Sequence, residues 1–432
     1  MAAQQEQTGP SEQTSVLRNR DFVLLWTGQT VSEVGSSVTQ LAIPLLAVIT
    51  LDATTFEVGA LAACTQLAFL LIALPAGAWV DRWRRRPVLI WADIGRMAII
   101  GSIPIADALG VLYLPQLFVV AIVAGVLTVF FDVAYQSYLP VLVEPEHLVD
   151  ANGKLGASQA FGQVAGPSFG GALVGAFGAG YAVIIDALSF LVSAVTTIGI
   201  RKHEPAPDAR HPDVRLRDEI KEGLAFVFHH PILRKVVGCT STSNFFSAAT
   251  FAVITIFLVR TLDSPTWVIG VVFSVGSLGG LIGGLLAGRI GKAVGTARII
   301  WLSQVVAGPF GLLAVIAFPG WGLALVAVSI LATSIGSVVY NTAQVSYRQS
   351  ICPPALLGRM NASVRFVVWG TMPLGALFGG ILGSIIGVRE TMLIGALGTW
   401  AACLWVVFSP LLHMRDLPTL EDEMSPRALA TS

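Results

Sequence analysis

The sequence predicts an all-α integral membrane protein with twelve transmembrane helices in two pseudo-symmetric six-helix bundles. Hydrophobic residues fill 54% of its 432 positions and charged residues only 12%, whereas soluble domains carry about 25% charged residues. Uncharged stretches of about 18–25 residues, the length of a spanning helix, recur along the chain. The sequence also repeats itself halfway along. The formal net charge of zero gives no indication of a nucleic-acid partner, and none is expected.

Each apolar stretch is long enough to cross the hydrocarbon core of a bilayer as a helix, at a rise of about 1.5 Å per residue. The boundary between the fifth and sixth spans depends only on the sequence GAFGAGY. The predicted spans cover residues 22–49, 57–80, 88–109, 115–139, 152–177, 180–200, 233–259, 266–288, 297–317, 322–346, 361–387 and 391–412.

The basic residues are distributed unevenly between alternate loops. With both termini inside, the outward loops contain only Arg260 and Arg389 of the 26 Lys and Arg residues, as the positive-inside rule requires. The first twenty residues are polar and lack the apolar region of a cleavable signal peptide. We therefore expect a multi-pass protein of the cell membrane with cytoplasmic tails at residues 1–21 and 413–432.

The sequence offers no signal of a metal site, a cofactor or an enzyme. The four cysteines lie in spans or on inward segments without Cys-x-x-Cys spacing, and the six histidines lie in cytoplasmic loops or tails. The Gly-Lys pairs at 153–154 and 291–292 are followed by Leu155 and Ala293, so neither is a Walker A sequence. ATP is therefore not the expected energy source.

A polar stretch at residues 201–232 divides the chain into halves at 22–200 and 233–412. Its prolines and mixed charges are typical of a linker. Its second part fits either an amphipathic helix in the membrane interface or a solvated linker helix. The apolar residues at helical spacing are Leu216, Ile220, Leu224 and Val227.

The two halves are internal repeats. An offset of about 209 residues keeps identities in register across a loop and into a span. Two parallel six-helix repeats are the plan of one large class of transporters. The matching pairs are Ser137 and Ser346, Tyr138 and Tyr347, Pro145 and Pro354, Leu148 and Leu357, Asn152 and Asn361, and Gly166 and Gly375.

The loop after the second span contains GAWVDRWRRR at residues 77–86, and GLLAGRIGK occupies 284–292 in the second half. The first copy resembles the Gly-x-x-x-Asp-Arg-x-Gly-Arg-Arg motif of the major facilitator superfamily, with Arg84 in place of glycine. The second copy has Gly288 in place of the acid. The chain thus resembles this superfamily along its whole length. The matching residues of the first copy are Gly77, Asp81, Arg82, Arg85 and Arg86.

The segment 137–171 resembles a narrower branch that contains bacterial siderophore exporters and macrolide-efflux-like proteins, and GPSFGG at 166–171 resembles an exporter motif. The resemblance implies a secondary transporter that exports a small organic compound, such as a drug, a siderophore or a secondary metabolite, by alternating access with proton antiport. A proton-coupled importer is the alternative, because the same architecture serves both directions. A membrane sensor or enzyme is disfavoured. We expect a monomer in the lipid bilayer.

The charges of the first loop also have a physical interpretation. Asp81 would accept hydrogen bonds from the positive N-terminus of a neighbouring helix. Arg82, Arg85 or Arg86 would reach Asp132 in the fourth span. These contacts would form a conformational latch at the cytoplasmic face. The arginines would also fix the topology by themselves, and both interpretations can hold together.

Charged residues within spans are costly in lipid, so they are the strongest site candidates. Glu33 lies near mid-depth of the first span and Asp186 in the outer part of the sixth. We predict that Glu33 carries the coupling proton or binds a cationic substrate; a hydrogen bond to a neighbouring helix is the alternative. Asp93, Arg96, Asp132 and Arg365, nearer the cytoplasmic side, are expected to form structural pairs or to snorkel toward water.

Polar and aromatic residues at a similar depth extend the candidate cavity, which suits a bulky amphipathic or cationic compound. For each of them an interhelical contact is the alternative. They are Gln29, Gln40, Asn244, Phe245, Asn341 and Gln344.

Glycines at every fourth position mark helix faces where the halves are expected to meet and slide, with static packing as the alternative. These stripes are Gly162, Gly166 and Gly170; Gly276, Gly280, Gly284 and Gly288; and Gly375, Gly379, Gly383 and Gly387.

Overall fold

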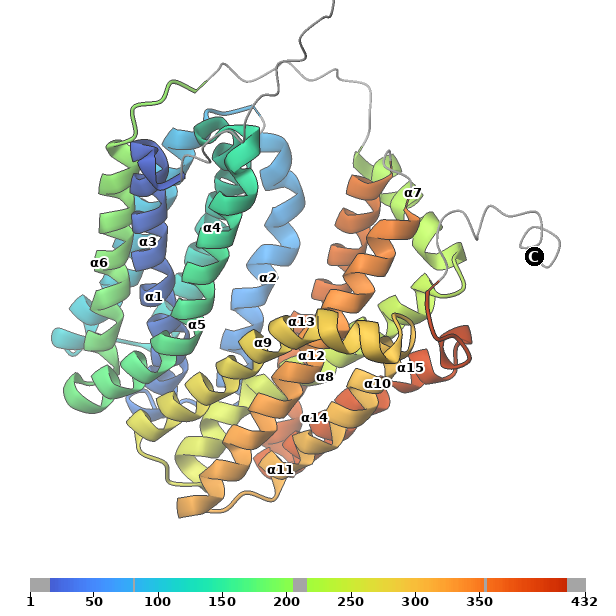
Figure 1. Cartoon of the computed structure of the whole chain (residues 1–432). Helices are drawn as coiled ribbons and strands as arrows, with labels where there is room; N and C mark the ends of the chain where they lie inside the picture. Colours follow the sequence, from blue (N-terminus) through green and yellow to red (C-terminus); the bar gives the residue numbers. More distant parts are fainter. Residues whose placement is uncertain (1–15, 81, 205–215, 353–355, 418–432) are drawn as a thin grey trace, which may run out of the picture.

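A computed structural model describes residues 16–80, 82–204, 216–352 and 356–417, and all regular structure within these ranges is helical. Figure 1 shows the two halves side by side, with the N-terminal half in blue to green and the C-terminal half in yellow to red. Asp81 and the middle of the predicted linker lie outside the described residues.

The N-terminal half contains six long helices and two short 3₁₀ turns, Val16–Arg18 and Pro145–His147. Every predicted span of this half coincides with one long helix, because uninterrupted apolar sequence in lipid must satisfy its own backbone hydrogen bonds. The helices are α1 (Arg20–Ile49), α2 (Thr55–Val80), α3 (Arg85–Ala108), α4 (Leu114–Leu142), α5 (Leu148–Phe177) and α6 (Ala179–Ile198).

The C-terminal half follows the same order with more interruptions. A linker helix precedes it, a π-turn (Phe257–Thr261) ends its first span, and two of its spans are broken into shorter helices. The helices are α7 (Leu216–His229), α8 (Leu233–Ile256), α9 (Thr266–Val294), α10 (Arg298–Ala307), α11 (Gly311–Val315), α12 (Leu323–Ile351), α13 (Leu357–Ile386), α14 (Val388–Ala401) and α15 (Leu404–Val407).

The predicted repeat is visible in the helix boundaries. The helices α4, α5 and α6 begin at residues 114, 148 and 179, and α12, α13 and α14 begin at 323, 357 and 388, each 209 positions later. The repeat departs from this register in the ninth span, where a 3₁₀ turn at Gly308–Phe310 separates α10 from α11. Pro309 explains this break, because proline has no N–H to donate within a helix.

Eleven helices among the described residues are long and apolar enough to cross a membrane. The predicted span 152–177 is not one of the eleven, although α5 is 30 residues long. Its mean hydropathy is low because small and polar residues replace the large apolar ones. This composition fits its position, since α5 packs between α1 and α9. A span that faces protein on both sides needs small residues more than apolar ones.

The linker helix α7 packs against α13, with Val227 buried in the core of the C-terminal half. A helix at this position was predicted, and its burial against protein explains the apolar spacing. Its contact with lipid stays a prediction.

The halves contact each other mainly along two helix pairs, α5 with α9 and α2 with α13, and α8 makes smaller contacts with α2 and α1. We call the end of the bundle that carries Arg82 and Arg84 the basic end, and the end that carries Asp52 and Arg260 the far end. In Figure 1, α2 and α13 lie apart at the upper side of the molecule, which is the basic end. The far-end contacts described below therefore hold the halves together.

Candidate functional site

Four carboxyl groups and one guanidinium gather inside the N-terminal half. We call Glu33 (α1), Asp93 and Arg96 (α3), Asp132 (α4) and Asp186 (α6) the carboxylate cluster; Arg96 interacts electrostatically with every acid in it. By contrast, residues 233–412 contain only two acidic residues. Asp263 lies in a loop, and Glu390 lies in the first turn of α14, at the far end. The embedded acids thus all belong to one half.

Arg96 lies at the centre of this cluster. It forms an ion pair with Asp93 of the same helix, and its guanidinium carbon lies 4.2 Å from the ring centroids of both Phe131 and Phe190. Its side chain is only 5% exposed. Two cation–π contacts and a charged partner hold the guanidinium in one place, and they join α3 to α4 and α6. This ion pair is of the structural kind expected for the charged residues nearer the cytoplasmic side, although the sequence did not indicate which residues pair.

Glu33 is half-buried on α1 and has one hydrogen bond, in which Gln29 Nε2 donates to Glu33 Oε1 over 3.0 Å. The Oε1 atom of Gln29 is buried without a partner among the described residues. The backbone of Glu33 lies against α5, where a Cβ on Gly162 would come within 3.2 Å of it. Glu33 and Gln29, both predicted site residues, therefore form a polar pair with unused capacity for hydrogen bonding.

Asp186 is 1% exposed and lies in the seam between α1 and α6. It accepts hydrogen bonds from Ser36 Oγ and Ser189 Oγ, each at 3.2 Å. A Cβ on Gly35 would lie 2.9 Å from its Oδ1 atom, so the backbone of α1 packs directly on this carboxyl. The structure therefore connects Asp186 to the cluster through α1, and it fits a proton-holding or structural group better than a substrate contact.

Two of the C-terminal candidates, Asn244 and Phe245, lie on α8. Asn244 Nδ2 donates to the carbonyl of Val368 over 3.1 Å, and Phe245 packs on Phe378 with ring centroids 5.2 Å apart. Both residues therefore contribute to the seam between α8 and α13, as in the interhelical alternative.

The remaining polar candidates lie on α12 and α1. Gln344 Nε2 donates to Asn341 Oδ1 over 2.7 Å; Gln344 is buried and Asn341 is exposed. Gln40 is exposed on α1, seven residues after Glu33. No contact between these C-terminal amides and the carboxylate cluster is present among the described residues.

The predicted latch residues make other contacts than those expected. Gly77 lies in α2, and a Cβ there would meet no described atom within 4 Å. Arg82 is exposed, and neither it nor Arg85 or Arg86 forms an ion pair with Asp132 among the described residues. Asp81 lies outside the described residues. In this conformation the basic loop is not joined to α4 by such a pair.

Glu204, which the sequence reasoning missed, binds Arg85 and Arg86 at the end of the basic loop. The amides of Arg85 and Arg86 donate to its two carboxylate oxygens over 2.7 and 3.2 Å, and Arg85 Nη1 lies 3.3 Å away. Glu204 is 6% exposed. It therefore caps the N-terminus of α3, a favourable place for an anion. Its sequence signal was weak, because it stands among charged residues that look like a solvated linker.

The contacts between the halves lie toward the far end. Arg260 Nη2 lies 2.7 Å from Asp52 Oδ1, and Ser168 Oγ lies 2.7 Å from Ser274 Oγ. A Cβ on Gly171 would lie 2.5 Å from the carbonyl oxygen of Thr266. These contacts join the connection after α1 and helix α5 to the beginning of the C-terminal bundle. The halves are therefore closed together at the far end.

The basic end lacks equivalent close approaches. Added Cβ atoms at glycines of α2, α5 and α9 near this end would meet no described atom within 4 Å; these are Gly77, Gly153, Gly156, Gly284 and Gly288. Near the middle of α2 and α13, Phe69 packs on Trp369, with ring centroids 4.6 Å apart. The molecule is thus closed at one end and open at the other.

Most glycines of the predicted stripes pack against helices of their own half. The stripe at 162, 166 and 170 packs on α1, where Cβ atoms would lie 2.3–3.3 Å from Glu33, Ser37 and Val38. Those at 375 and 379 pack on α8 in the same half. These glycines follow the static-packing alternative, whereas Gly383 of the third stripe faces the other half, because a Cβ there would lie 2.7 Å from Thr55 Cγ2 of α2. Neighbouring glycines occupy the boundary between halves, namely Gly171 against Gly270 and Gly59 against Gly380.

This fold, with two six-helix repeats that meet along α2, α5, α9 and α13, defines a membrane transporter. The model of the Major Facilitator Superfamily matches residues 25–373, and the chain belongs to this family. The resemblance of the motif at residues 77–86 is confirmed at the level of the family.

Two relatives match almost the whole chain. The multidrug efflux pump Tap of Mycolicibacterium fortuitum is 26% identical over 395 residues, which are 89% of this chain and 94% of that one. Macrolide efflux protein A of Streptococcus pyogenes is 24% identical over 411 residues, which are 92% and 97% of the two chains. The chain is therefore similar to the efflux-like branch of the family, as the segment 137–171 indicated.

Solved structures share the fold at low sequence identity. The nucleoside transporter NupG, solved as a mutant, matches with a TM-score of 0.73 at 11% identity and covers 90% of this chain and 99% of its own. A bacterial homologue of the iron transporter ferroportin, 16% identical, matches with a TM-score of 0.70 in its inward-facing state and 0.57 in its outward-facing state. These matches cover 90–91% of this chain and 98% of each other chain.

Proposed function

We propose that the chain exports a small organic compound across the cell membrane by proton antiport, with the halves at 22–200 and 233–412 alternating access to a central site. The observation that carries this proposal is the carboxylate cluster, in which Glu33 keeps a single hydrogen bond while four acids share one arginine. A proton-driven exchanger needs such a group, whose protonation changes when water or a cation reaches it.

The closed far end supports alternating access. If the basic end faces the cytoplasm, as the distribution of Lys and Arg predicts, the structure corresponds to the inward-facing state. The higher TM-score with the inward-facing ferroportin homologue agrees with this assignment. The predicted latch contacts would form in the outward-facing state, in which the basic end is closed. Closure of the basic end would bring the loop with Arg82 toward the C-terminal half.

The substrate class follows from the charge of the N-terminal half. Glu33 and Asp132 lie in electrostatic range of each other, and only Arg96 lies among them as a base. A cation that enters can replace a proton on this cluster, and aromatic side chains add cation–π attraction. We therefore propose an organic cation or amphipathic compound. The efflux pumps named above support export of such a compound.

The test uses the full chain in proteoliposomes with an imposed pH gradient and fluorescent organic cations as substrates. We expect wild-type chain to move the dye against its gradient and Glu33→Gln to abolish this pH-driven movement. Glutamine keeps the size of the side chain and its bond to Gln29, but it cannot release a proton. The control is Glu146→Gln, which makes the same change at an exposed carboxyl in the loop before α5 and should leave the pH-driven movement unchanged.

A normal pH-driven signal from Glu33→Gln would rule out this carboxyl as the essential proton carrier. If the variant still moves the dye down its gradient but no longer responds to the pH gradient, the result supports Glu33 as the proton carrier. Accumulation assays in cells that lack their own exporters decide the direction. Lower dye content with the chain supports export, and a rise in the content of a nutrient would show that the chain is instead an importer.

A further inference from the structure

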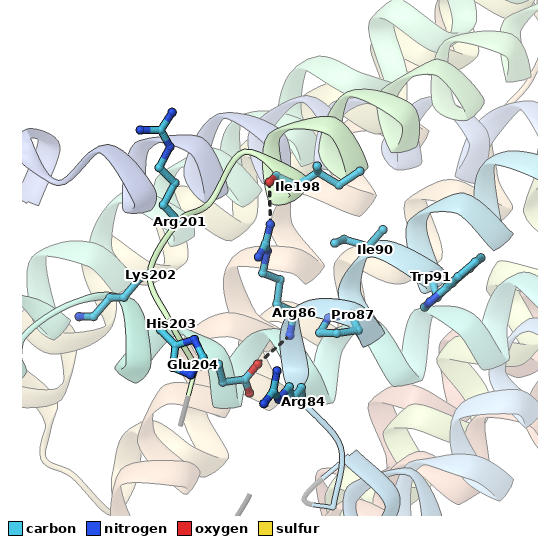
Figure 2. Close-up of a pocket in the computed structure, with 10 residues that line it drawn as sticks. All are labelled: Arg84, Arg86, Pro87, Ile90, Trp91, Ile198, Arg201, Lys202, His203 and Glu204. Atoms are coloured by element: carbon cyan, nitrogen blue, oxygen red, sulfur yellow. Dashed lines mark hydrogen bonds between the residues drawn. The ribbon is translucent and has the colours of Figure 1, made fainter. Parts of the chain in front are cut away.

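A basic pocket lies on the outer side of the N-terminal half at the basic end. It has a volume of about 410 Å³ and lies between the beginning of α3 and the segment that follows α6. Figure 2 shows Arg86 crossing the pocket from α3 toward Ile198, with Ile90 and Trp91 on one side and residues 201–204 on the other. The proposed transport cycle does not use this pocket.

The positive charge of the pocket exceeds what its acids neutralise. Arg84, Arg86, Arg201 and Lys202 line it, with Glu204 as the one lining carboxylate. Glu204 is already bound by the amides of α3 and by the neighbouring arginine, so the N-terminus of α3 is occupied. Asp21, at the start of α1, does not line the pocket. Among the described residues, its carboxylate accepts hydrogen bonds from the backbone amides of Arg201 and Lys202, and not from their side chains.

Several basic groups keep free donors. Arg86 donates from Nε to the carbonyl of Thr197 and from Nη2 to that of Ile198, which leaves Nη1 without a bond among the described residues. The side chains of Arg84 and Arg201 are exposed and form no described hydrogen bond or ion pair. A guanidinium matches the geometry of phosphate oxygens, so these donors suit a phosphate ester.

The same pocket has an apolar edge that points away from the protein. Trp91 is 70% exposed and Ile198 is 52% exposed. Trp91 stands six residues after the beginning of α3, about 9 Å along the helix at 1.5 Å per residue. Exposed tryptophan at this depth is typical of the membrane interface, where lipid headgroups give way to acyl chains.

We propose that this pocket binds an anionic glycerophospholipid from the leaflet that meets the basic end. The phosphodiester lies against Arg84 and Arg86, with Arg201 and Lys202 at the rim, and an acyl chain runs along Trp91 and Ile198. Basic pockets between transmembrane helices are suited to such headgroups. The apolar edge distinguishes a lipid from a free phosphate, because a soluble anion would gain nothing from it.

The experiment is native mass spectrometry of the purified full chain in detergent with equal amounts of phosphatidylglycerol, phosphatidylethanolamine and phosphatidylcholine. We expect retained phosphatidylglycerol to exceed the other two lipids. The double variant Arg84→Gln/Arg201→Gln should lose this retention by roughly tenfold or more, because each basic group near a membrane surface adds to anionic lipid binding. It spares Arg86, whose contacts hold the end of α6.

The matched control is Arg289→Gln/Lys292→Gln, which removes two exposed charges from the last turns of α9, at the corresponding position of the other half. It should retain phosphatidylglycerol as wild type does. Equal loss in both double variants, or retention in Arg84→Gln/Arg201→Gln, would overturn the proposal. Displacement of the lipid by equimolar glycerol phosphate would show a soluble phosphate site instead. Melting temperatures of both variants exclude unfolding as the cause of any loss.

Discussion

Arg96 shows how one residue organises a polar cluster within lipid. Its charge is balanced by Asp93, and its planar faces are covered by Phe131 and Phe190. A buried ion pair gains little over an apolar pair, but removal of one partner leaves an uncompensated buried charge. The value of Arg96 therefore lies in fixing the positions of the acids around it.

We predict that Arg96→Gln strongly destabilises the protein, on the order of 3–5 kcal/mol, because Asp93 loses its buried partner. The melting temperature of the purified protein measures the effect. The double variant Asp93→Asn/Arg96→Gln should recover part of the loss, since it removes the uncompensated charge. If the double variant is as unstable as the sum of the two single variants, the pair is not the source of the effect.

The residues of the cluster were predicted better than their contacts. The cost of charge in lipid identifies Glu33, Asp93 and Asp132 from sequence alone. It does not reveal that Arg96 serves all the acids, because this depends on how α1, α3, α4 and α6 pack. Glu204 was missed for the opposite reason. It stands in a polar segment where an acid costs nothing, and only its folded position makes it a helix cap.

Small residues decide how closely the helices approach, and sequence spacing cannot say which neighbour they face. A repeat of four places glycines on one helix face. The stripe at 162–170 faces α1, while Gly171, one residue further, faces α9 across the boundary between halves. The two faces of α5 are thus both lined with glycine. The helix boundaries, which depend on local sequence, agree more closely with the predicted spans.

We predict that Gly171→Leu opens the far end. A Cβ at this position would lie 2.5 Å from the carbonyl oxygen of Thr266 and 2.9 Å from the Cα of Gly270, and backbone cannot yield as a side chain can. Helices α5 and α9 must then separate. Labelling of Ser274→Cys by a membrane-impermeant reagent should rise severalfold. Gly153→Leu is the control, because an added Cβ at this position would meet no described atom within 4 Å, and it should leave labelling unchanged.

At the beginning of α3, we predict that Glu204→Gln lowers stability by about 1 kcal/mol, the typical contribution of a helix N-cap. Glutamine still accepts a hydrogen bond from one amide, but it loses the charge that faces Arg85 and the helix N-terminus. The melting temperature should fall by a few degrees. An equally large fall in Glu144→Gln, at an exposed carboxyl in the loop before α5, would contradict an effect of the capping contacts.

At the scale of the whole molecule, two kinds of contact close the far end, and they differ in strength. The ion pair between Asp52 and Arg260 is exposed, with 95% of the aspartate side chain accessible. Such surface pairs contribute about 0–1 kcal/mol. The glycine contacts of α5 with α9 and of α2 with α13 bring backbone against backbone toward the far end, at Gly171 with Gly270 and at Gly59 with Gly380. Packing therefore determines the closed state, and the ion pair adjusts it.

The orientation of the molecule is open to direct measurement. We predict that Arg84→Cys, at the basic end, is protected from an impermeant reagent in intact cells, whereas Tyr113→Cys at the far end is labelled. Both positions are exposed in the structure, so access to the reagent depends on the side of the membrane. The measurement uses a chain whose four native cysteines are replaced by alanine. Labelling of Arg84→Cys from outside would reverse the assigned topology.

The confinement of all embedded carboxyls to the N-terminal half has an electrical consequence. One elementary charge that crosses a potential of 100 mV exchanges about 2.3 kcal/mol with the membrane field. In the proposed cycle, the cluster crosses the field in one direction with a proton and in the other with the exported compound. If that compound is a monovalent cation, the two forms carry the same charge and the membrane voltage favours neither direction. If it is a neutral amphipathic compound, the cluster returns with one extra negative charge, and the C-terminal half contributes no further acid that could change this balance. Voltage then acts on one direction of the turnover more than on the other.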